Sequence, residues 1–384
     1  MTPAARVQAA IVLLDDILAG QPAEQALTSW ARRSRFAGSK DRAAIRDHVF
    51  DALRCRRSFA ALGGAETGRG LMLGALRAQD ADLSRYFDGS AYGPAEVEGS
   101  ETGRPPAPGA EEGDLPDWLW PEFSRSLGDQ ADHAAAYLRT RAPVFLRANL
   151  RKTTRNALRV ALQDEGIVAQ PHALSPAALE VTDGARRLRN SPLFHSGAFE
   201  LQDAASQAVV DALPLSDGQR VLDFCAGGGG KTLAMGARAD LELVAHDANA
   251  ARMRDLPARA ARAGVAVSVQ TDLTSAGQFD LVLCDAPCSG SGSWRRAPDG
   301  KWALTPDRLD HLTTLQETIL DQASECVADG GTLAYATCSV LRVENEDRVS
   351  AWLNKHPDWA CKSAQRWPLN GGGDGFFVAI FTRQ

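Results

Sequence analysis

The sequence lacks any long hydrophobic run. No window approaches about 18 consecutive apolar residues, which is the length that a membrane-spanning helix needs. The apolar N-terminal stretch, residues 1–20, is interrupted by Asp15 and Asp16, so it does not match the uninterrupted apolar core of a signal peptide. We therefore expect a cytoplasmic protein with no membrane partner.

Cysteine is scarce and irregularly spaced. The chain has seven cysteines, an odd number, and contains no Cys-x-x-Cys pair. This usage argues against a disulfide framework and favours reduced thiols. Four cysteines of the C-terminal half lack the paired spacing of zinc ligands, namely Cys225, Cys284, Cys288 and Cys338. We therefore expect no bound metal.

An overall excess of positive charge is also lacking. The 384 residues, 44% hydrophobic and 23% charged, are typical of a globular protein of two or three domains with a formal net charge of −6. The acidity is local, because residues 79–117 hold ten acids and two arginines. Residues 141–160 instead hold six basic residues and no acid, a density suited to a phosphate backbone. A solvated face of an ordinary domain explains this density equally well.

The N-terminal part of the chain, residues 1–87, is predicted to form a small all-helical domain. Its apolar residues recur at helical spacing in two stripes, Val7, Ile11, Leu14 and Ile45, Val49, Leu53. Residues 88–114 are rich in Gly, Pro, Glu and Ser, so they cannot bury enough apolar surface to offset the entropy of ordering. We predict an acidic, flexible linker there.

The rest of the chain is predicted to form an α/β structure, with one subdomain over residues 115–205 and a catalytic domain over residues 206–384. Short apolar runs alternate with helical stretches in the second of these, which is typical of βαβ units. The expected strands are Arg220–Phe224, Glu242–His246, Val265–Gln270, Phe279–Asp285, Gly331–Thr337 and Gly375–Thr382. We expect a mainly parallel sheet closed by an antiparallel edge.

A glycine-rich loop follows the first of these strands, in the sequence VLDFCAGGGGKT from Val221. The loop misses the phosphate-binding pattern GxxxxGK[ST] only because Cys225 replaces its first glycine, so a nucleoside triphosphate site with Asp285 near the magnesium must be considered. The alternative is a Rossmann-like loop for an adenosyl ligand. Asp247, 24 residues beyond Asp223, then stands where an acid binds the ribose hydroxyls.

Two further motifs place a thiol just beyond an apolar strand. DAPCSGSGS begins at Asp285 and carries Cys288, and YATCSV begins at Tyr335 and carries Cys338. Ligands of open α/β sheets bind at the carboxyl ends of the strands, so these thiols should converge on one crevice with Asp223, Asp247 and Asp285. Because a nucleoside triphosphatase has no use for two thiols, the pair favours the adenosyl ligand.

At these residues the sequence resembles the Sun family of RNA cytosine-C5 methyltransferases, and within it the bacterial small-subunit rRNA enzymes with a NusB-like N-terminal domain. The resemblance covers most of the chain. It is carried by LDFCAGGGGKT, HDANAARM, LCDAPCSGSGSWRRAPDGKW, YATCSVLRVENED and DGFFVAIFTR. The family usually has Ala-Pro where this chain has Gly227 and Gly228, which should make the loop more flexible without removing a reactive side chain.

The resemblance implies a Rossmann-like sheet that binds S-adenosylmethionine and makes 5-methylcytosine. Cys338 would attack C6 of the cytosine, Cys288 would assist loss of the C5 proton and release of the RNA, and Asp285 would bind the N3/N4 edge of the flipped base. The implied cofactor-binding residues are Asp223, Cys225, Ala226, Gly227, Gly228, Gly229, Gly230, Lys231, Asp247, Arg252, Asp272 and Asp285.

The resemblance also implies RNA as the partner, with small-subunit rRNA as the expected substrate of a monomeric enzyme. Residues 1–87 would be a short RNA-binding domain and residues 115–205 an RNA-contacting subdomain. The basic stretch Arg141–Arg159 and the segment SWRRAPDGKW would supply charge and stacking surfaces, through Arg295, Arg296, Lys301 and two tryptophans. A tRNA substrate, a P-loop NTPase and a non-catalytic RNA assembly factor remain as alternatives.

Overall fold

The computed structural model describes residues 1–369 and 372–384. Within these residues the chain forms two compact units. The first comprises Met1–Arg141 together with Trp294–Leu304, and the second comprises Ala142–Ser293 together with Thr305–Gln384. The unit boundary therefore falls after Arg141 and not at the predicted 114/115.

The first unit is all-helical. Its helices are α1 (Pro3–Leu18), α2 (Ala23–Arg33), α3 (Ser39–Arg54), α4 (Arg56–Gly63), α5 (Gly68–Arg77), α6 (Trp120–Leu127), α7 (Ala131–Leu138) and α13 (Asp299–Ala303), with short turns η1 (Leu83–Arg85) and η2 (Gly128–Gln130). Thr2 caps α1 by accepting a hydrogen bond from the Ala5 amide, and Pro3 suits the first helical turn. The predicted apolar stripes are buried in one core, which confirms the helical prediction.

The predicted flexible linker over residues 88–114 was wrong. Its backbone lies against the helices, where the Arg104 amide donates to the Ala61 carbonyl and the Arg69 side chain holds Glu101. Asp114 is fully buried and accepts hydrogen bonds from Ser58 Oγ and from the Arg57 and Ser58 amides. Ion pairs with helix arginines thus order an apolar-poor segment that cannot bury a core of its own.

The segment SWRRAPDGKW departs from its prediction at three of its five named residues, whereas Arg296 is exposed and Trp302 is half-buried. Trp294, Arg295 and Lys301 are 2%, 1% and 1% exposed and pack into the helical unit, so they offer no surface to RNA. The Arg54 side chain donates to the Arg295 carbonyl, and the Lys301 ammonium donates to the Arg54 carbonyl. The Arg295 guanidinium lies over the ring of Tyr137. Trp302 donates to the Leu53 carbonyl.

The second unit contains a seven-stranded sheet among the described residues. The strand order is β10-β11-β9-β8-β5-β6-β7, with the strands β5 (Arg220–Asp223), β6 (Glu242–His246), β7 (Ser268–Gln270), β8 (Phe279–Asp285), β9 (Val327–Thr337), β10 (Trp359–Trp367) and β11 (Phe376–Arg383). Strands β5 to β9 pair in parallel, and β11 pairs antiparallel with both β9 and β10. The predicted sheet is therefore confirmed, and β10 was missed.

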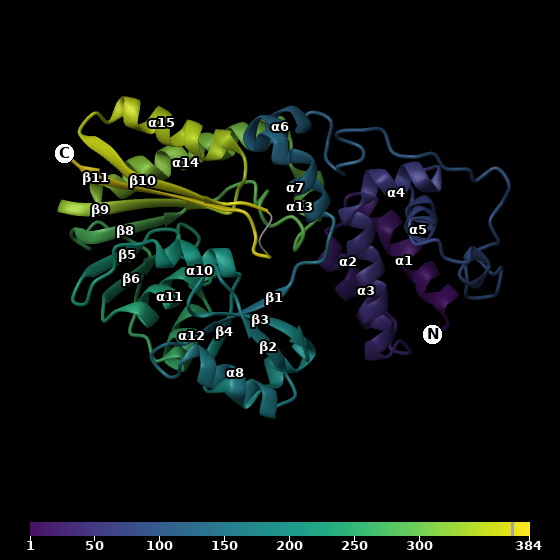
Figure 1. Cartoon of the computed structure of the whole chain (residues 1–384), viewed down its shortest axis with the longest axis horizontal. Coiled ribbons are helices and arrows are strands. Elements are labelled where there is room, and N and C mark those ends of the chain that lie inside the picture. The colour runs from purple at the N-terminus through teal and green to yellow at the C-terminus, as the bar shows by residue number, and fades with distance from the viewer. Residues whose placement is uncertain (370–371) are drawn as a thin grey trace. The chain divides into compact units, whose positions relative to one another are not determined.

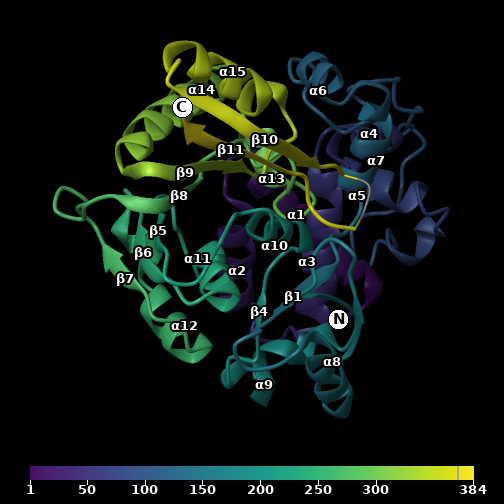
Figure 2. The ribbon, with the colours of Figure 1, turned by 60° about the vertical axis from the view of Figure 1, so that its left-hand side comes forward.

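Helices cover both faces of this sheet (Figures 1 and 2). On one face lie α10 (Ala204–Asp211), α11 (Gly230–Arg238) and α12 (Leu256–Ala263), and on the other α14 (Pro306–Glu325) and α15 (Glu346–Lys355). Strand residues alternate between the two cores, so that Val221 faces the first set of helices and Leu222 faces the second. Short turns η4 (Ala250–Met253) and η5 (Arg342–Glu344) precede α12 and α15.

A smaller sheet of order β2-β3-β1-β4 precedes the large one, and sequence reasoning did not predict it. It comprises β1 (Val144–Ala148), β2 (Val168–Pro171), β3 (Ala178–Asp183) and β4 (Phe199–Leu201), with α8 (Arg155–Asp164), η3 (Ala185–Asn190) and α9 (Pro192–His195) between them. All three strand pairings in this sheet are antiparallel.

The basic stretch Arg141–Arg159 runs through this small sheet and is largely engaged in internal contacts. The Arg147 side chain is 5% exposed, and Arg151 pairs with Asp240. Lys152 donates to the carbonyls of Ser196 and Arg262, and Arg155 donates to those of His172 and Ser175. The prediction that this stretch follows a phosphate backbone is therefore wrong for most of its cations, because they satisfy carbonyls and carboxylates of the same unit.

Candidate active site

The predicted site residues converge on the carboxyl edge of the parallel strands. Asp223 ends β5, Asp247 follows β6, Asp272 follows β7, Asp285 ends β8 and Cys338 follows β9. Because parallel strands present their carboxyl ends at one edge, residues separated by more than 100 positions meet there. This is the convergence that the motif positions predict.

The glycine loop links β5 to α11. The Ala226 amide donates to the His246 carbonyl, and the Gly229 amide donates to the Ala226 carbonyl, so the loop folds back over the end of β6. Gly227 and Gly229 have φ angles of +51° and +79°, and a Cβ on Gly229 would lie 2.2 Å from the Leu256 side chain. Glycine is required at these positions because L side chains avoid this backbone region. Cys225, at the start of the loop, is shielded enough that burial raises its pKa.

Asp247 binds this loop directly. Its Oδ2 accepts a hydrogen bond of 2.9 Å from the Gly227 amide and lies 3.0 Å from the Arg252 guanidinium. Its Oδ1 accepts from the Asn249 amide at 2.9 Å. The carboxylate is thus fixed at the end of β6, where a Rossmann-like fold binds ribose hydroxyls. Asp272, predicted near the adenine, is exposed on the turn after β7, and its carboxylate accepts from the Thr274 amide.

Asp223 is a buried carboxyl with one free oxygen. Its Oδ2 accepts a 2.6 Å hydrogen bond from Thr232 Oγ1, whereas its Oδ1 is buried without a partner in the described residues. Burial raises the pKa of Asp223 to about 7, and the neighbouring Asp285 charge adds to this rise. An unsatisfied buried acceptor beside a glycine loop is suited to a ligand that brings hydrogen-bond donors or positive charge.

Lys231 holds the carboxylate of Asp285. Its Nζ is 2.7 Å from Asp285 Oδ2, and the lysine side chain is 7% exposed. Although burial opposes its charge, the charge of Asp285 and the hydrogen bond to it raise the pKa of Lys231, so the lysine stays cationic. In a P-loop the lysine must reach the phosphates. Here the ion pair occupies it, which argues against the NTPase alternative.

The two thiols are in contact. Cys288 Sγ and Cys338 Sγ lie 3.4 Å apart, on the loops that follow β8 and β9. The hydrogen bond to Cys338 and burial raise the pKa of Cys288 well above its ordinary value. Either sulfur can be the donor of this hydrogen bond, and the raised pKa of Cys288 favours the protonated form of that thiol. Cys284, four residues earlier and within β8, is fully buried. Burial raises its pKa, so it is an inert core residue.

A buried polar cluster behind the thiols was missed by sequence reasoning. It contains Ser289, Ser291, Gln316, Thr337, Ser339, Glu344 and Asn345. Glu344 and Asn345 belong to the motif YATCSVLRVENED, in which three acidic residues follow the thiol within nine positions. These three closely spaced acidic residues were the available sign of the polar cluster. Sequence alone, however, does not distinguish a buried acidic residue from an exposed one.

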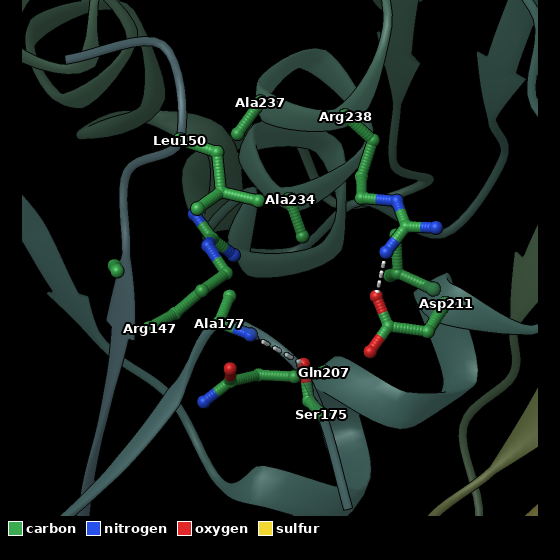
Figure 3. Close-up of a pocket in the computed structure, with 11 residues that line it drawn as sticks. Arg147, Leu150, Ser175, Ala177, Gln207, Asp211, Ala234, Ala237 and Arg238 are labelled. Carbon is green, nitrogen blue, oxygen red and sulfur yellow. Dashed lines mark hydrogen bonds and ion pairs between the residues drawn. The ribbon is translucent and has the colours of Figure 1, made fainter. Parts of the chain in front are cut away.

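Arg147 of the small sheet also reaches the site. Its guanidinium donates to Gln202 Oε1 and, at 2.8 Å, to the carbonyl of Gly230, the first residue of α11. Burial lowers the pKa of Arg147 to about 10. A small pocket lies beside it, lined by residues of β1, α10 and α11, where Arg238 pairs with Asp211 (Figure 3). Its volume of about 10 Å³ is about that of one water site, so it is not the ligand crevice.

The described residues, 1–369 and 372–384, show neither a metal-binding cluster nor a membrane-spanning helix. Within these ranges no group of three or more His, Cys, Asp or Glu side chains is arranged to hold a metal ion. In the same ranges no helix has the length and apolarity needed to cross a membrane.

The fold and the site together define a Rossmann-like α/β protein with its ligand crevice at the strand ends. The family model of the 16S rRNA methyltransferases RsmB/F matches residues 210–382. A second model, the ferredoxin-like domain of the RsmF/B-like methyltransferases, matches residues 115–186. The chain belongs to the RsmB/F family, which confirms the resemblance seen in its motifs.

Curated relatives agree with this assignment. Ribosomal RNA small subunit methyltransferase B of Citrobacter koseri is 33% identical over 285 residues, which cover 70% of this chain and 66% of that protein. The protein of the same name from Vibrio cholerae is 32% identical over 284 residues, covering 70% and 65%. The match therefore spans slightly less than two thirds of the length of these relatives.

Solved structures share the fold. PH0851 has a TM-score of 0.77 at 21% identity and covers 100% of this chain and 99% of its own. A methyltransferase homologue from Pyrococcus horikoshii has a TM-score of 0.63 at 24% identity, covering 72% and 97%. NSun6 from Pyrococcus horikoshii, solved with SFG, has a TM-score of 0.62 at 18% identity, covering 70% and 98%. The predicted Rossmann-like fold with a preceding helical unit is thus confirmed.

Proposed function

We propose that this protein transfers a methyl group from S-adenosylmethionine to C5 of a cytosine in small-subunit rRNA. The single observation that carries the proposal is the contact of two thiols, Cys288 and Cys338, beside the Lys231–Asp285 pair. Cytosine C5 is a weak nucleophile, so a thiolate must first add to C6. A site with one attacking and one assisting thiol meets that requirement.

The cofactor residues fit a ligand with ribose hydroxyls and positive charge. Asp247 is held in place by Gly227 and Arg252 and would accept the ribose hydroxyls. The free oxygen of Asp223 and the raised pKa of its carboxyl favour a donor or a cation beside it. S-adenosylmethionine would supply an electrophilic methyl group there. The glycine loop leaves room for the backbone to approach it.

Cys338 would be the nucleophile. Its sulfur lies in hydrogen-bond contact with that of Cys288, and a thiol hydrogen donated by Cys288 would stabilise negative charge on the attacking sulfur. Addition of this thiolate to C6 forms the S–C6 bond and moves the C5=C6 electrons through C4 onto N3, which takes up a proton. Asp285, whose carboxylate is held by the Lys231 ammonium, would bind the N3/N4 edge and pass a proton of that ammonium to N3. C5 then carries the electron pair that takes the methyl group.

Cys288 would complete the reaction. Once Cys338 is bonded to C6 its negative charge is gone, and the largest cause of the raised pKa of Cys288 disappears. Cys288 can then release its proton to solvent and accept the proton from C5. The C5–H electrons restore the C5=C6 bond, the S–C6 bond breaks, Cys338 leaves as a thiolate, and the N3 proton returns to the Lys231–Asp285 pair. The methylated RNA is then free to dissociate.

The helical unit offers an RNA-binding surface that replaces the one expected at Arg141–Arg159. Residues 25–40 contain four basic residues and no acid, and all four are exposed, namely Arg32, Arg33, Arg35 and Lys40. None of them forms an ion pair within the part of the chain that the structure describes. Phe36 and Tyr92, 76% and 82% exposed, line a hollow of about 580 Å³ together with Trp30. Exposed cations around aromatic rings suit an unpaired RNA strand.

The substrate is tested by bisulfite sequencing of total RNA from cells with and without this gene. We expect one 5-methylcytosine of small-subunit rRNA to disappear. Loss of a tRNA site with every rRNA site intact would assign the enzyme to tRNA, and loss of none would favour a non-catalytic assembly factor. The monomeric state and the cytoplasmic location stay predictions.

A further inference from the structure

Glu344 lies between the two thiol-bearing loops. It is fully buried and follows β9 by seven residues. One carboxylate oxygen accepts a 2.7 Å hydrogen bond from the Ser289 amide, in the loop of Cys288. The other accepts from Ser289 Oγ and from Ser339 Oγ, in the loop of Cys338. One side chain thus ties together the residues that follow both thiols.

The surrounding network extends this link. Gln316 of α14 donates to Glu344 Oε1 at 3.1 Å and to the Pro287 carbonyl, which immediately precedes Cys288. Ser291 and Ser339 share a 2.9 Å hydrogen bond, and the Tyr335 hydroxyl donates to the Glu344 carbonyl. Hydrogen bonds from neutral donors therefore link the loop of Cys288 to the loop of Cys338.

The Glu344 carboxylate is buried without a cation paired with it in the described residues. Within residues 1–369 and 372–384 it forms no ion pair, and the nearby Arg348 is paired with Glu317. A buried carboxylate without a cation is stabilised chiefly by the hydrogen bonds that it accepts, and a neutral amide could make several of the same hydrogen bonds. A carboxylate in place of an amide at this position points to a role beyond linking the two loops.

We propose that Glu344 is a positioning residue that fixes the two loops with Cys288 as the hydrogen donor and Cys338 as the nucleophile. The proposal rests on the proposed function and deepens it, since it names the residue that holds the two thiols in their separate roles. Glu344 touches neither RNA nor cofactor in this scheme. It acts through Ser289 and Ser339, the immediate neighbours of the two reactive cysteines.

The electrostatics of the thiol pair support the geometry. The negative charge of Glu344 is one of the causes that raise the pKa of Cys288, after the hydrogen bond to Cys338, burial and the Cys338 charge. The other titratable groups that face this pair are Tyr335, Lys231 and Asp285. The charge of Glu344 raises the pKa of Cys288. Lys231, by contrast, attracts a negative charge on Cys338, and this attraction raises the pKa of Lys231.

The test compares thiol reactivity in Glu344→Gln, Glu344→Asp and the matched control Glu346→Gln. Glu346 lies two residues further along and pairs with Arg366, away from both cysteines. Each purified protein, without RNA, is alkylated with iodoacetamide between pH 6 and pH 10, and the rates at Cys288 and Cys338 are followed separately by peptide mass spectrometry. Because this readout needs no methyl transfer, it is independent of the proposed function.

We expect Glu344→Gln to move the alkylation midpoint of Cys288 to lower pH, and Glu344→Asp, which keeps the charge, to leave that midpoint in place. Both variants should lower kcat for methyl transfer by about 10²-fold, since misplacement by about 1 Å has that cost. Glu346→Gln should match the wild type in both assays. An unchanged Cys288 midpoint in a folded Glu344→Gln protein would overturn the proposal, as would unchanged kcat in that variant. Failure of the wild type to methylate any RNA, with the shift present, would overturn only the proposed function.

Discussion

Cys288 Sγ and Cys338 Sγ lie 3.4 Å apart although 50 residues separate them in the sequence. The separation exceeds the roughly 2.05 Å of a disulfide bond, so the sulfurs are two thiols in hydrogen-bond contact. Adjacent parallel strands β8 and β9 deliver them to the same edge of the sheet. This pairing places two thiols in contact at the carboxyl edge of the sheet, one on each of the loops that follow these strands.

Cofactor affinity should depend on pH through Asp223. Burial raises the pKa of this carboxyl to about 7, so it is mostly protonated at pH 6 and mostly ionised at pH 8. A cationic cofactor is bound better by the ionised form, so affinity for S-adenosylmethionine should rise by about tenfold between these values. Calorimetric titration at both pH values measures it. Asp223→Asn should remove the pH dependence, and a wild-type affinity that falls with rising pH would contradict the assignment.

Asp285 should be needed for chemistry more than for cofactor binding. Asp285→Asn removes the carboxylate that Lys231 holds and that would bind and protonate the N3/N4 edge, so kcat should fall by about 10²–10⁴-fold. Single-turnover methyl transfer with tritiated cofactor measures this loss. Asp280→Asn is the matched control, because Asp280 lies at the other end of β8 and its carboxylate accepts only the Arg220 amide among the described contacts. Equal losses in the two variants would show that Asp285 has a structural role alone.

The basic residues after α2 should contribute to RNA binding. Changing Arg32, Arg33 and Arg35 together to Ser should raise KM for RNA and leave kcat unchanged. The slope of log Kd against log salt should decrease by about 2, since each lost single-strand phosphate contact accounts for about 0.7. Filter binding at several salt concentrations measures the slope. A triple change of the exposed Arg85, Arg308 and Lys362 to Ser removes the same charge and should have little effect on that slope.

Asp114 should stabilise the helical unit. Asp114→Ala removes a buried carboxylate that Ser58, the Arg57 amide and Arg139 hold, and it leaves Arg139 without this partner. The free energy of unfolding should fall by about 3–5 kcal/mol, and trypsin should cleave residues 88–114 faster. Denaturant unfolding and timed proteolysis measure both effects. Glu112→Ala, at an exposed neighbouring position, should change neither, and equal behaviour of the two variants would contradict the packed state of this segment.

The catalytic sheet could be predicted because its strands are continuous apolar runs. The bounds of β6 and β8 agree with the predicted Glu242–His246 and Phe279–Asp285. Parallel topology then places Asp247, Asp285 and Cys288 at one edge before any coordinates are known. The local motifs were informative because a glycine loop and a thiol that each follow a parallel strand must both lie at the carboxyl edge of the sheet.

Other features could not be predicted because they depend on tertiary partners. Strand β10 has four polar residues among its nine and buries only its two terminal tryptophans, and its one strand partner in the described sheet is β11. Arg147 and Lys301 are cations whose burial depends on carbonyl groups far away in the sequence, so their charge suggested RNA contacts. Glu344 is one of three acids in its motif, and only the fold distinguishes it from the other two.

The central claim is that Cys338 attacks C6 and Cys288 takes the proton from C5. A gel assay of covalent protein–RNA adducts tests it most directly. Cys288→Ala and Cys338→Ala proteins are incubated with unmodified small-subunit rRNA and S-adenosylmethionine, denatured, and separated. Cys288→Ala should accumulate a protein–RNA adduct that survives denaturation, because C5 cannot lose its proton. Cys338→Ala should form none, because no S–C6 bond can form. An adduct in Cys338→Ala and none in Cys288→Ala would reverse the roles and contradict the account.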